Sequence, residues 1–423
     1  MELTRFSWAN WSSSLQKTWR KTWRGFDGWL LFFPALLLGT GVLTIYSTRP
    51  TGEEWKAQLL TGILGIIWVL LLARFPYERL LRWQWVIFAG VCLLLGSVLF
   101  TGNSVKGAQR WIEVAGLQLQ PSEFAKVGMI VVLAAFMHKY PVRVFPQIWG
   151  VLAVLAVPFG LVFKQPDLGT ALVFGAIGLG MLYWGGAKLA WLLLLVSPLV
   201  SAILYSLWLP GWILWVIVAG ILAWASLEWR LPSLIVALVL NLVSGGLGQT
   251  LWNLLKPYQQ QRLLIFLDPG QDPLGSGYHI IQSEIAIGAG GLWGRGLFQG
   301  TQTQLNFIPE QHTDFIFSAL GEEWGFIGGI VLLLCFLGLL CRLVIVANNA
   351  RDDFGSLIAI GVFTMLLFQL VVNIGMTIGL APVTGIPLPF ITFGRSFLIT
   401  CFTAIGLVES VAAYSRDKLV FPE

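Results

Sequence analysis

A glycine-rich stretch carries the acidic residue with the strongest case for a chemical role. It reads Asp268-Pro-Gly-Gln-Asp-Pro-Leu-Gly-Ser-Gly-Tyr278. Asp268 followed by Gly270 is typical of a turn in which the Asp side chain caps its own backbone. Asp272 differs, because Gly275 and Gly277 follow it and could bring the backbone close to a bulky ligand. The interpretation as a simple turn is therefore weaker for Asp272 than for Asp268.

A second charged pair lies at the start of an apolar run, in Gln120-Pro-Ser-Glu-Phe-Ala-Lys126. Pro121 suits the first position of a helix, and Glu123 suits its positive amino-terminal end. Glu123 and Lys126 are three residues apart and therefore share a helix face. Two interpretations stay open: a structural ion pair at a helix end, or a group that positions a substrate, since ionisable residues in membrane spans tend to face cavities.

More ionisable residues gather around the tenth apolar run. Pro309-Glu-Gln-His-Thr-Asp-Phe315 places three of them just before it. His312 on its own is more typical of an interfacial histidine than of a catalyst. Glu322 and Glu323 follow about two turns into the helix. We expect a polar cavity to shelter at least one of these two carboxyl groups, with protonation as the alternative.

The elements that must position these groups are membrane helices. The chain has 57% hydrophobic and only 11% charged residues, which excludes an ordinary soluble protein. Twelve apolar runs are long enough to cross about 30 Å of hydrocarbon as helices. They are Trp29–Ser47, Ala57–Ala73, Trp85–Thr101, Ser122–His138, Pro146–Phe163, Gly169–Gly185, Leu189–Leu209, Trp212–Leu227, Leu231–Leu247, Phe315–Cys341, Leu357–Ile378 and Phe397–Tyr414. The expected fold is an all-α polytopic membrane protein with about 10–12 transmembrane helices.

Charge predicts the orientation of these helices. With a cytoplasmic amino terminus, most Lys and Arg residues lie inside, as the positive-inside rule requires, and both termini are cytoplasmic. The first apolar run is too long for a signal-peptide core, so we expect it to remain as a span. Arg262, Arg295 and Arg395 then lie outward against the rule, which indicates an anionic group outside. The net charge of +5 is an orientation signal and favours anionic lipid as a contact, not nucleic acid.

The predicted organisation has one membrane domain with one long loop. A basic cytoplasmic segment spans 1–28, the membrane domain 29–414 and a cytoplasmic tail 415–423. The stretch 251–314, before the tenth apolar run, is polar and Gly-rich, and a loop of this length usually carries function. A second irregular stretch, 381–390, contains three prolines and is a candidate re-entrant segment. The sequence shows no His/Cys metal constellation and no Walker-type phosphate loop.

Six motifs in order resemble the shape, elongation, division and sporulation (SEDS) family. His279-Ile-Ile-Gln followed by Ile285-Ala-Ile-Gly288 is similar to the elongation branch of that family, not its division branch. The resemblance covers most of the chain. The six motifs are Lys106-Gly-Ala-Gln-Arg-Trp-Ile112, Gln120-Pro-Ser-Glu123 with Ala125-Lys126, Gln165-Pro-Asp-Leu-Gly-Thr170, Asp272-Pro-Leu-Gly-Ser-Gly-Tyr-His-Ile-Ile-Gln-Ser283, Pro309-Glu310 with His312-Thr-Asp-Phe-Ile-Phe317, and Gly385-Ile-Pro-Leu-Pro389.

The resemblance implies a peptidoglycan glycosyltransferase that polymerises lipid II on the outer face of the bacterial plasma (inner) membrane, for cell elongation and rod shape. Asp272 matches the family's essential Asp and is the expected catalytic base. Arg110 and Arg262 are expected to neutralise the departing diphosphate in one inverting displacement. The full set of expected substrate-binding residues is Arg110, Trp111, Glu123, Lys126, Arg262 and His312.

The resemblance also predicts partners. These are lipid II, the growing glycan strand, a class B penicillin-binding transpeptidase, scaffold proteins of the elongation complex and membrane lipid. A divalent cation such as Mg²⁺ or Mn²⁺ is the one candidate cofactor. Two other functions stay open: a flippase for lipid-linked cell-wall precursors, and a noncatalytic scaffold of the elongation machinery.

Two regions depart from the family pattern. Three apolar runs occupy 189–247, where the family usually has one, so two helices are extra and the sidedness of the long loop is preserved. Phe393-Gly-Arg-Ser-Phe397 replaces the Ser/Gly-rich run usual at the end of the last motif, which leaves Arg395 without a role carried over from the family.

Overall fold

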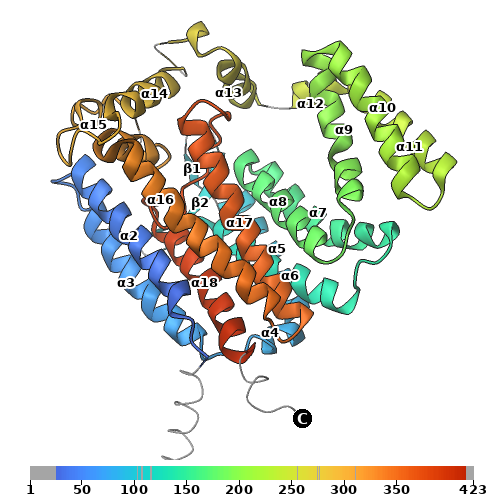
Figure 1. Cartoon of the computed structure of the whole chain (residues 1–423), viewed down its shortest axis with the longest axis horizontal. Coiled ribbons are helices and arrows are strands. Elements are labelled where there is room, and N and C mark those ends of the chain that lie inside the picture. Colours follow the sequence, from blue (N-terminus) through green and yellow to red (C-terminus); the bar gives the residue numbers. More distant parts are fainter. Residues whose placement is uncertain are drawn as a thin grey trace, which may run out of the picture.

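The computed structural model describes residues 25–415, apart from 102, 106–107, 115–116, 255, 274, 276 and 310. Within this part the chain is a bundle of long helices (Figure 1). Lys106 and Glu310, which belong to the motifs above, lie outside the described residues, as do most of the segments 1–28 and 415–423.

All twelve predicted apolar runs form helices whose ends differ from prediction by a few residues, except that α16 continues past the predicted end at Cys341 to Asn348. Among the described residues, nine helices are long and apolar enough to cross a membrane, and α5, α8 and α11 are shorter apolar helices. The twelve are α2 (Gly28–Thr48), α3 (Glu54–Leu72), α5 (Gln84–Thr101), α6 (Pro121–Lys139), α7 (Ile148–Lys164), α8 (Leu168–Trp184), α9 (Leu189–Leu207), α10 (Leu209–Ser226), α11 (Arg230–Gly246), α16 (Ile316–Asn348), α17 (Asp353–Thr377) and α18 (Arg395–Ser415).

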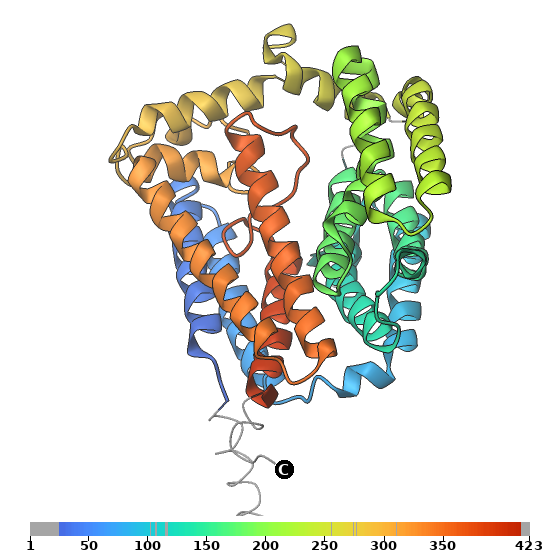
Figure 2. The same cartoon turned by 45° about the vertical axis from the view of Figure 1, so that its right-hand side comes forward.

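The twelve helices alternate in direction, which gives the bundle two distinct ends (Figures 1 and 2). The start of α2 and the end of α18 lie at one end, called the terminal end below. The short helices that connect α11 to α16 lie at the other, called the loop end. The alternation agrees with the predicted topology, in which both termini share one side.

Helices α6 and α18 form the centre of the bundle. About 78% of the apolar window of α6 and 89% of that of α18 are buried, against 28% for α3, α7, α9 and α10. The outer helices therefore present apolar side chains to the surroundings, as a lipid-facing helix must. The charged pair predicted at the start of α6 lies in the most enclosed part of the molecule.

The predicted loop 251–314 contains short helices. These are α12 (Gly248–Leu254), α13 (Pro257–Leu267), η2 (Pro269–Gln271), α14 (Tyr278–Gly290) and α15 (Thr301–Gln304). Figure 2 shows α13 and α14 running across the loop end above the long helices. On the terminal side, short turns α4 (Arg79–Arg82) and η1 (Phe145–Gln147) join the spans.

A small antiparallel sheet between α5 and α6 was not predicted. Its strands are β1 (Asn103–Val105), β2 (Ala108–Val114) and β3 (Leu117–Leu119), in the order β1-β2-β3. Ser104 pairs with Gln109, and Ile112 pairs with Leu119. The sheet carries Arg110 and Trp111.

Helices α9, α10 and α11 pack on one another around a polar core. The Ser197 hydroxyl donates to Asn241 Oδ1 (2.6 Å), and the Ser201 hydroxyl donates to the Asn241 carbonyl (2.7 Å). The Trp212 indole donates to Ser201 Oγ (2.8 Å). These bonds hold the three helices together where lipid offers no hydrophobic driving force. The unit stands at the side of the bundle (Figure 1) and corresponds to the extra apolar segments.

Helix α16 is broken at Gly325, whose φ of 66° and ψ of −166° suit glycine alone. In an unbroken helix, Phe326 N–H would donate to the Glu322 carbonyl and Ile327 N–H to the Glu323 carbonyl. Instead, those N–H groups donate to the carbonyls of Gly291 (2.9 Å) and Leu292 (3.1 Å). The carbonyls of Glu322 and Glu323 accept from the N–H groups at positions 295 and 296, at 2.9 and 3.0 Å. The 291–296 turn thus replaces both bonds.

The stretch 381–390 has no helix or strand, as expected for an irregular segment, and most of its second half is buried. Leu388 and Phe390 are fully buried. Asn373 donates to the carbonyls of Ile386 (2.8 Å) and Asp314 (3.0 Å). Protein groups therefore satisfy irregular backbone that lipid could not.

Candidate functional site

Arg110 and Asp167 meet at the turn between α7 and α8. Arg110 Nη2 donates to the Pro166 carbonyl (2.5 Å), and Arg110 Nη1 lies 3.7 Å from Asp167 Oδ1. Asp167 also caps α8, because its carboxylate accepts from the backbone N–H (3.2 Å) and hydroxyl (2.9 Å) of Thr170. The turn therefore holds the Arg110 guanidinium through the Pro166 carbonyl and the Asp167 carboxylate, and the Asp167 carboxylate is itself held by Thr170.

Gln120 connects this turn to the start of α6. Its amide donates to Asp167 Oδ2 (3.2 Å) and to Ser122 Oγ (3.1 Å). The amino-terminal ends of α6 and α8 thus lie side by side at the loop end, with Arg110 between the sheet and both helices. Positive helix dipoles and a guanidinium together favour an anion there.

The predicted pair Glu123 and Lys126 forms inside the protein. The Lys126 ammonium lies 2.7 Å from Glu123 Oε2, and the two residues are only 1% and 3% exposed. The ammonium also lies 5.5 Å from the centre of the Phe397 ring on α18. The pair is therefore buried at the start of α6, and a buried pair costs much more to break than an exposed one. Both interpretations of its role, structural and substrate-positioning, stay open.

Helix α13 contributes Tyr258 and Arg262. The Tyr258 hydroxyl donates to the Pro166 carbonyl (2.6 Å), and the Arg262 guanidinium lies 5.7 Å from the centre of the Tyr258 ring. Surrounding protein lowers the pKa of Arg262, and repulsion from Arg110 lowers it further, while Asp314 and Asp167 oppose this. The Arg262 guanidinium therefore interacts electrostatically with the Arg110 guanidinium and with the carboxylates of Asp167 and Asp314.

Asp272 lies in the turn after η2 and is half-buried. Its carbonyl accepts from the N–H groups of Gly275 (3.3 Å) and Gly277 (3.0 Å). A Cβ on Gly275 would collide with the Asp272 carboxylate. Gly275 therefore also has a local reason to be glycine, because the turn folds back on Asp272 itself. Asp268 caps the Gly270 N–H (3.1 Å), as predicted.

Trp111 and His312 occupy different surroundings. Trp111 is half-buried on β2, and strand alternation directs it to the face opposite Arg110. His312 is buried, with its ring centre 6.1 Å from that of Phe393, whose N–H donates to the His312 carbonyl (3.1 Å). The structure thus brings Arg110 and Arg262 to one turn and pairs Glu123 with Lys126. Trp111, Asp272 and His312 lie on three other segments: β2, the turn after η2, and the stretch before α16.

Glu322 and Glu323 are sheltered by folded chain. The Glu322 carboxylate accepts from the N–H groups of Gln302 and Thr303, both at 2.9 Å, at the start of α15. Glu323 accepts from the Ser47 hydroxyl. Backbone and hydroxyl donors therefore take the place of the polar cavity expected from the sequence. Arg295 likewise donates to the Ala289 carbonyl (3.1 Å), and Arg395 opens α18 in an exposed position.

Sequence reasoning missed Asp167 and Tyr258. Asp167 stands in a quoted motif but received no role, although an Asp before an apolar helix is a common cap signal. No local signal marks Tyr258, since its partner is 92 residues away.

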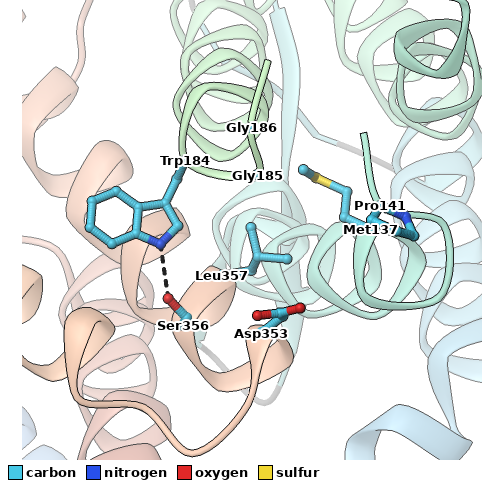
Figure 3. Close-up of a pocket in the computed structure, with 8 residues that line it drawn as sticks. All are labelled: Met137, Pro141, Trp184, Gly185, Gly186, Asp353, Ser356 and Leu357. Carbon is cyan, nitrogen blue, oxygen red and sulfur yellow. Dashed lines mark hydrogen bonds between the residues drawn. The ribbon is translucent and has the colours of Figure 1, made fainter. Parts of the chain in front are cut away.

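A pocket of about 240 Å³ lies at the terminal end (Figure 3). In it, the Trp184 indole donates to Ser356 Oγ (2.8 Å) beside Asp353. None of the predicted site residues lines it. Its lining is Met137, Pro141, Trp184, Gly185, Gly186, Asp353, Ser356 and Leu357.

Comparison with known proteins identifies the family of this chain. The family model for the cell cycle proteins FtsW, RodA and SpoVE matches residues 28–214 and 210–417. The chain belongs to this family. It is 36% identical over 425 residues to the peptidoglycan glycosyltransferase RodA of Treponema pallidum, covering 92% of this chain and 98% of the relative. It is 35% identical over 392 residues to the peptidoglycan glycosyltransferase MrdB of Escherichia coli K12, covering 90% and 94%.

Two solved structures share the fold. One chain comes from work on the structural coordination of polymerization and crosslinking by a peptidoglycan synthase complex. It is 32% identical with a TM-score of 0.69, and the match covers 92% of this chain and 98% of that one. The RodA protein of Thermus thermophilus is 26% identical with a TM-score of 0.60, covering 92% and 96%. The protein described here is accordingly a multi-pass membrane protein of the same family.

Proposed function

We propose that the chain is a peptidoglycan glycosyltransferase that joins lipid II disaccharide units into glycan strands. The observation that carries the proposal is the meeting of Arg110 and Arg262 at one turn on the loop end, in a chain whose relatives are named peptidoglycan glycosyltransferases. Two guanidinium groups suit a diphosphate, because charge-assisted hydrogen bonds are strongest to such oxygens.

In the proposed reaction, a sugar hydroxyl of one lipid-linked unit attacks the anomeric carbon of another. The new glycosidic bond forms as the bond to the diphosphate breaks, and the anomeric centre inverts. Asp272 takes the proton of the attacking hydroxyl. Arg110 and Arg262 stabilise the negative charge that grows on the departing polyprenyl diphosphate.

The remaining predicted binding residues are proposed to hold the substrates of this reaction. Lys126 supplies a buried cation close to the proposed anion site, held by Glu123. Trp111 and His312 are proposed to contact the sugars or the peptide at the loop end.

A divalent cation such as Mg²⁺ or Mn²⁺ stays a prediction. The described residues contain no group of three or more His, Cys, Asp and Glu side chains that could hold one, whereas one or two carboxylates together with diphosphate oxygens suffice for Mg²⁺. The Asp167 carboxylate is already taken by Thr170, Gln120 and Arg110. We derive no step through a metal.

The proposed setting is the bacterial plasma membrane, with both termini cytoplasmic and the loop end extracytoplasmic. On this proposal 1–28 and 415–423 are cytoplasmic segments and 29–414 is one membrane domain whose catalytic loop is 251–314. The proposed protein partners are a class B penicillin-binding transpeptidase and elongation scaffold proteins. The likeness to a chain studied in a peptidoglycan synthase complex supports the first of these.

The test uses purified protein, labelled lipid II and gel separation of glycan chains, with and without a cognate transpeptidase. We expect chains that lysozyme digests and that disappear with Asp272→Asn. Translocation of labelled lipid II across vesicles by the same preparation, without chain formation, would instead support the flippase.

A further inference from the structure

The Pro166 carbonyl joins three segments that are distant in the sequence. It belongs to the turn between α7 and α8, and it accepts from Arg110 on β2 (2.5 Å) and from the Tyr258 hydroxyl on α13 (2.6 Å). A carbonyl oxygen has two lone pairs, so both are used. The position of α13 over the bundle and the position of the Arg110 guanidinium therefore depend on the same atom.

Tyr258 acts on the second arginine through its ring. The Arg262 guanidinium lies over the Tyr258 ring at 5.7 Å, a cation–π distance. One tyrosine thus contacts Arg262 through its ring and is bonded to the same carbonyl as Arg110. Such a contact holds like charges near each other before an anion arrives, which reduces the cost of ordering them on binding.

The hydrogen bond from Tyr258 to the Pro166 carbonyl also holds in place the start of α13, the helix that leads to Asp272. Tyr258 is the second residue of α13 (Pro257–Leu267), which continues through η2 (Pro269–Gln271) into Asp272. Two other bonds of this region are local: Gln260 donates to the Trp252 carbonyl (2.7 Å), and the Lys256 N–H donates to Gln259 Oε1 (2.9 Å). Tyr258, by contrast, attaches the helix to the turn that binds Arg110.

We propose that Tyr258 is a positioning residue that docks α13 on the α7–α8 turn and aligns Arg110 with Arg262 for a diphosphate group. The inference rests on the proposed function, because it assigns the arginine pair to the departing diphosphate. Tyr258 itself touches no reacting atom.

The first test compares Tyr258→Phe, which keeps the ring and removes the hydroxyl, with Tyr258→Leu, which removes both. For polymerisation of lipid II we expect kcat/KM to fall about 3- to 10-fold in Tyr258→Phe, the effect of one hydrogen bond, and further in Tyr258→Leu. Gln260→Leu is the matched control, since it removes a bond of similar length that ends within the loop. It should retain wild-type kinetics.

The second test needs no turnover. Binding of farnesyl diphosphate and of farnesyl monophosphate is measured by tryptophan fluorescence, together with the Tm. We expect the wild type to prefer the diphosphate, and Tyr258→Phe to lose most of that preference with an unchanged Tm. A purely structural tyrosine would lower the Tm and weaken both probes equally.

The outcomes separate this inference from the proposed function. Normal kinetics and normal diphosphate preference in Tyr258→Phe overturn the role of Tyr258 even if the wild type polymerises lipid II. Absence of diphosphate preference in the wild type overturns it as well. A wild type that prefers the diphosphate through Tyr258 but forms no glycan would contradict the proposed function and leave the positioning role supported.

Discussion

The carboxylate of Glu123 and the ammonium of Lys126 lie 2.7 Å apart, enclosed between the two most buried helices of the bundle. Phe397 on α18 covers the ammonium at 5.5 Å. Each charge is tolerable there only because the other is present, since an isolated buried charge is strongly unfavourable.

Replacing Glu123 by Gln is therefore expected to destabilise the fold by about 3–5 kcal/mol, the range for removing one partner of a buried pair. The charge-swapped double mutant, Glu123→Lys with Lys126→Glu, should recover part of the Tm but little polymerisation, because the cation near the anion site has moved. Thermal unfolding and glycan assays on the same preparations measure both.

The control for the swap is Glu53 with Lys56, which has the same spacing but is exposed, at 3.9 Å. Exchanging these charges should change the Tm and the activity little, because exposed pairs contribute about 0–1 kcal/mol. Near-normal polymerisation in the Glu123/Lys126 swap would reject a positioning role and leave a structural pair.

Asp272→Asn should lower polymerisation by at least about 100-fold, the contribution of a general base. The amide keeps the shape but cannot accept a proton at neutral pH. Asp268→Asn should be much milder, since Asp268 caps Gly270 and Asn caps nearly as well. Equal losses in the two variants, measured as glycan formed per folded molecule, would remove Asp272 from the mechanism.

Gly325→Ala should lower the Tm, because Ala at φ 66° and ψ −166° is strained and its Cβ would collide with the Gly294 backbone. Gly39→Ala provides the comparison: Gly39 lies within α2 with open space around it, so Ala should be neutral or slightly stabilising. A continuous α16 would instead be indicated if Gly325→Ala were the more stable of the two.

The proposed topology is tested with single cysteines in a background without native cysteines. Gln261→Cys on α13 is exposed at the loop end and should react with an impermeant thiol reagent added to intact cells. Lys188→Cys, exposed between α8 and α9 at the terminal end, should react only after permeabilisation. The reversed pattern would place the loop end inside and contradict the proposed site of polymerisation.

The sequence predicted the features that depend on residues close together in the chain. The apolar runs predicted the twelve helices, the spacing of Glu123 and Lys126 predicted their contact, and the Asp268 turn was evident from two residues. Contacts between distant segments were not predictable. Pro166 meets Tyr258 across 92 residues, and Gly325 breaks α16 only because the 291–296 turn is there to replace two backbone bonds.

The break in α16 also bears on how the membrane stays electrically tight. An interrupted helix normally exposes peptide groups that water must solvate, and water files at such places conduct protons. Here the 291–296 turn supplies the missing partners. It accepts from the N–H groups of Phe326 and Ile327 and donates to the carbonyls of Glu322 and Glu323. Because protein groups satisfy these four backbone groups, the break in α16 does not itself call for a file of water at this place.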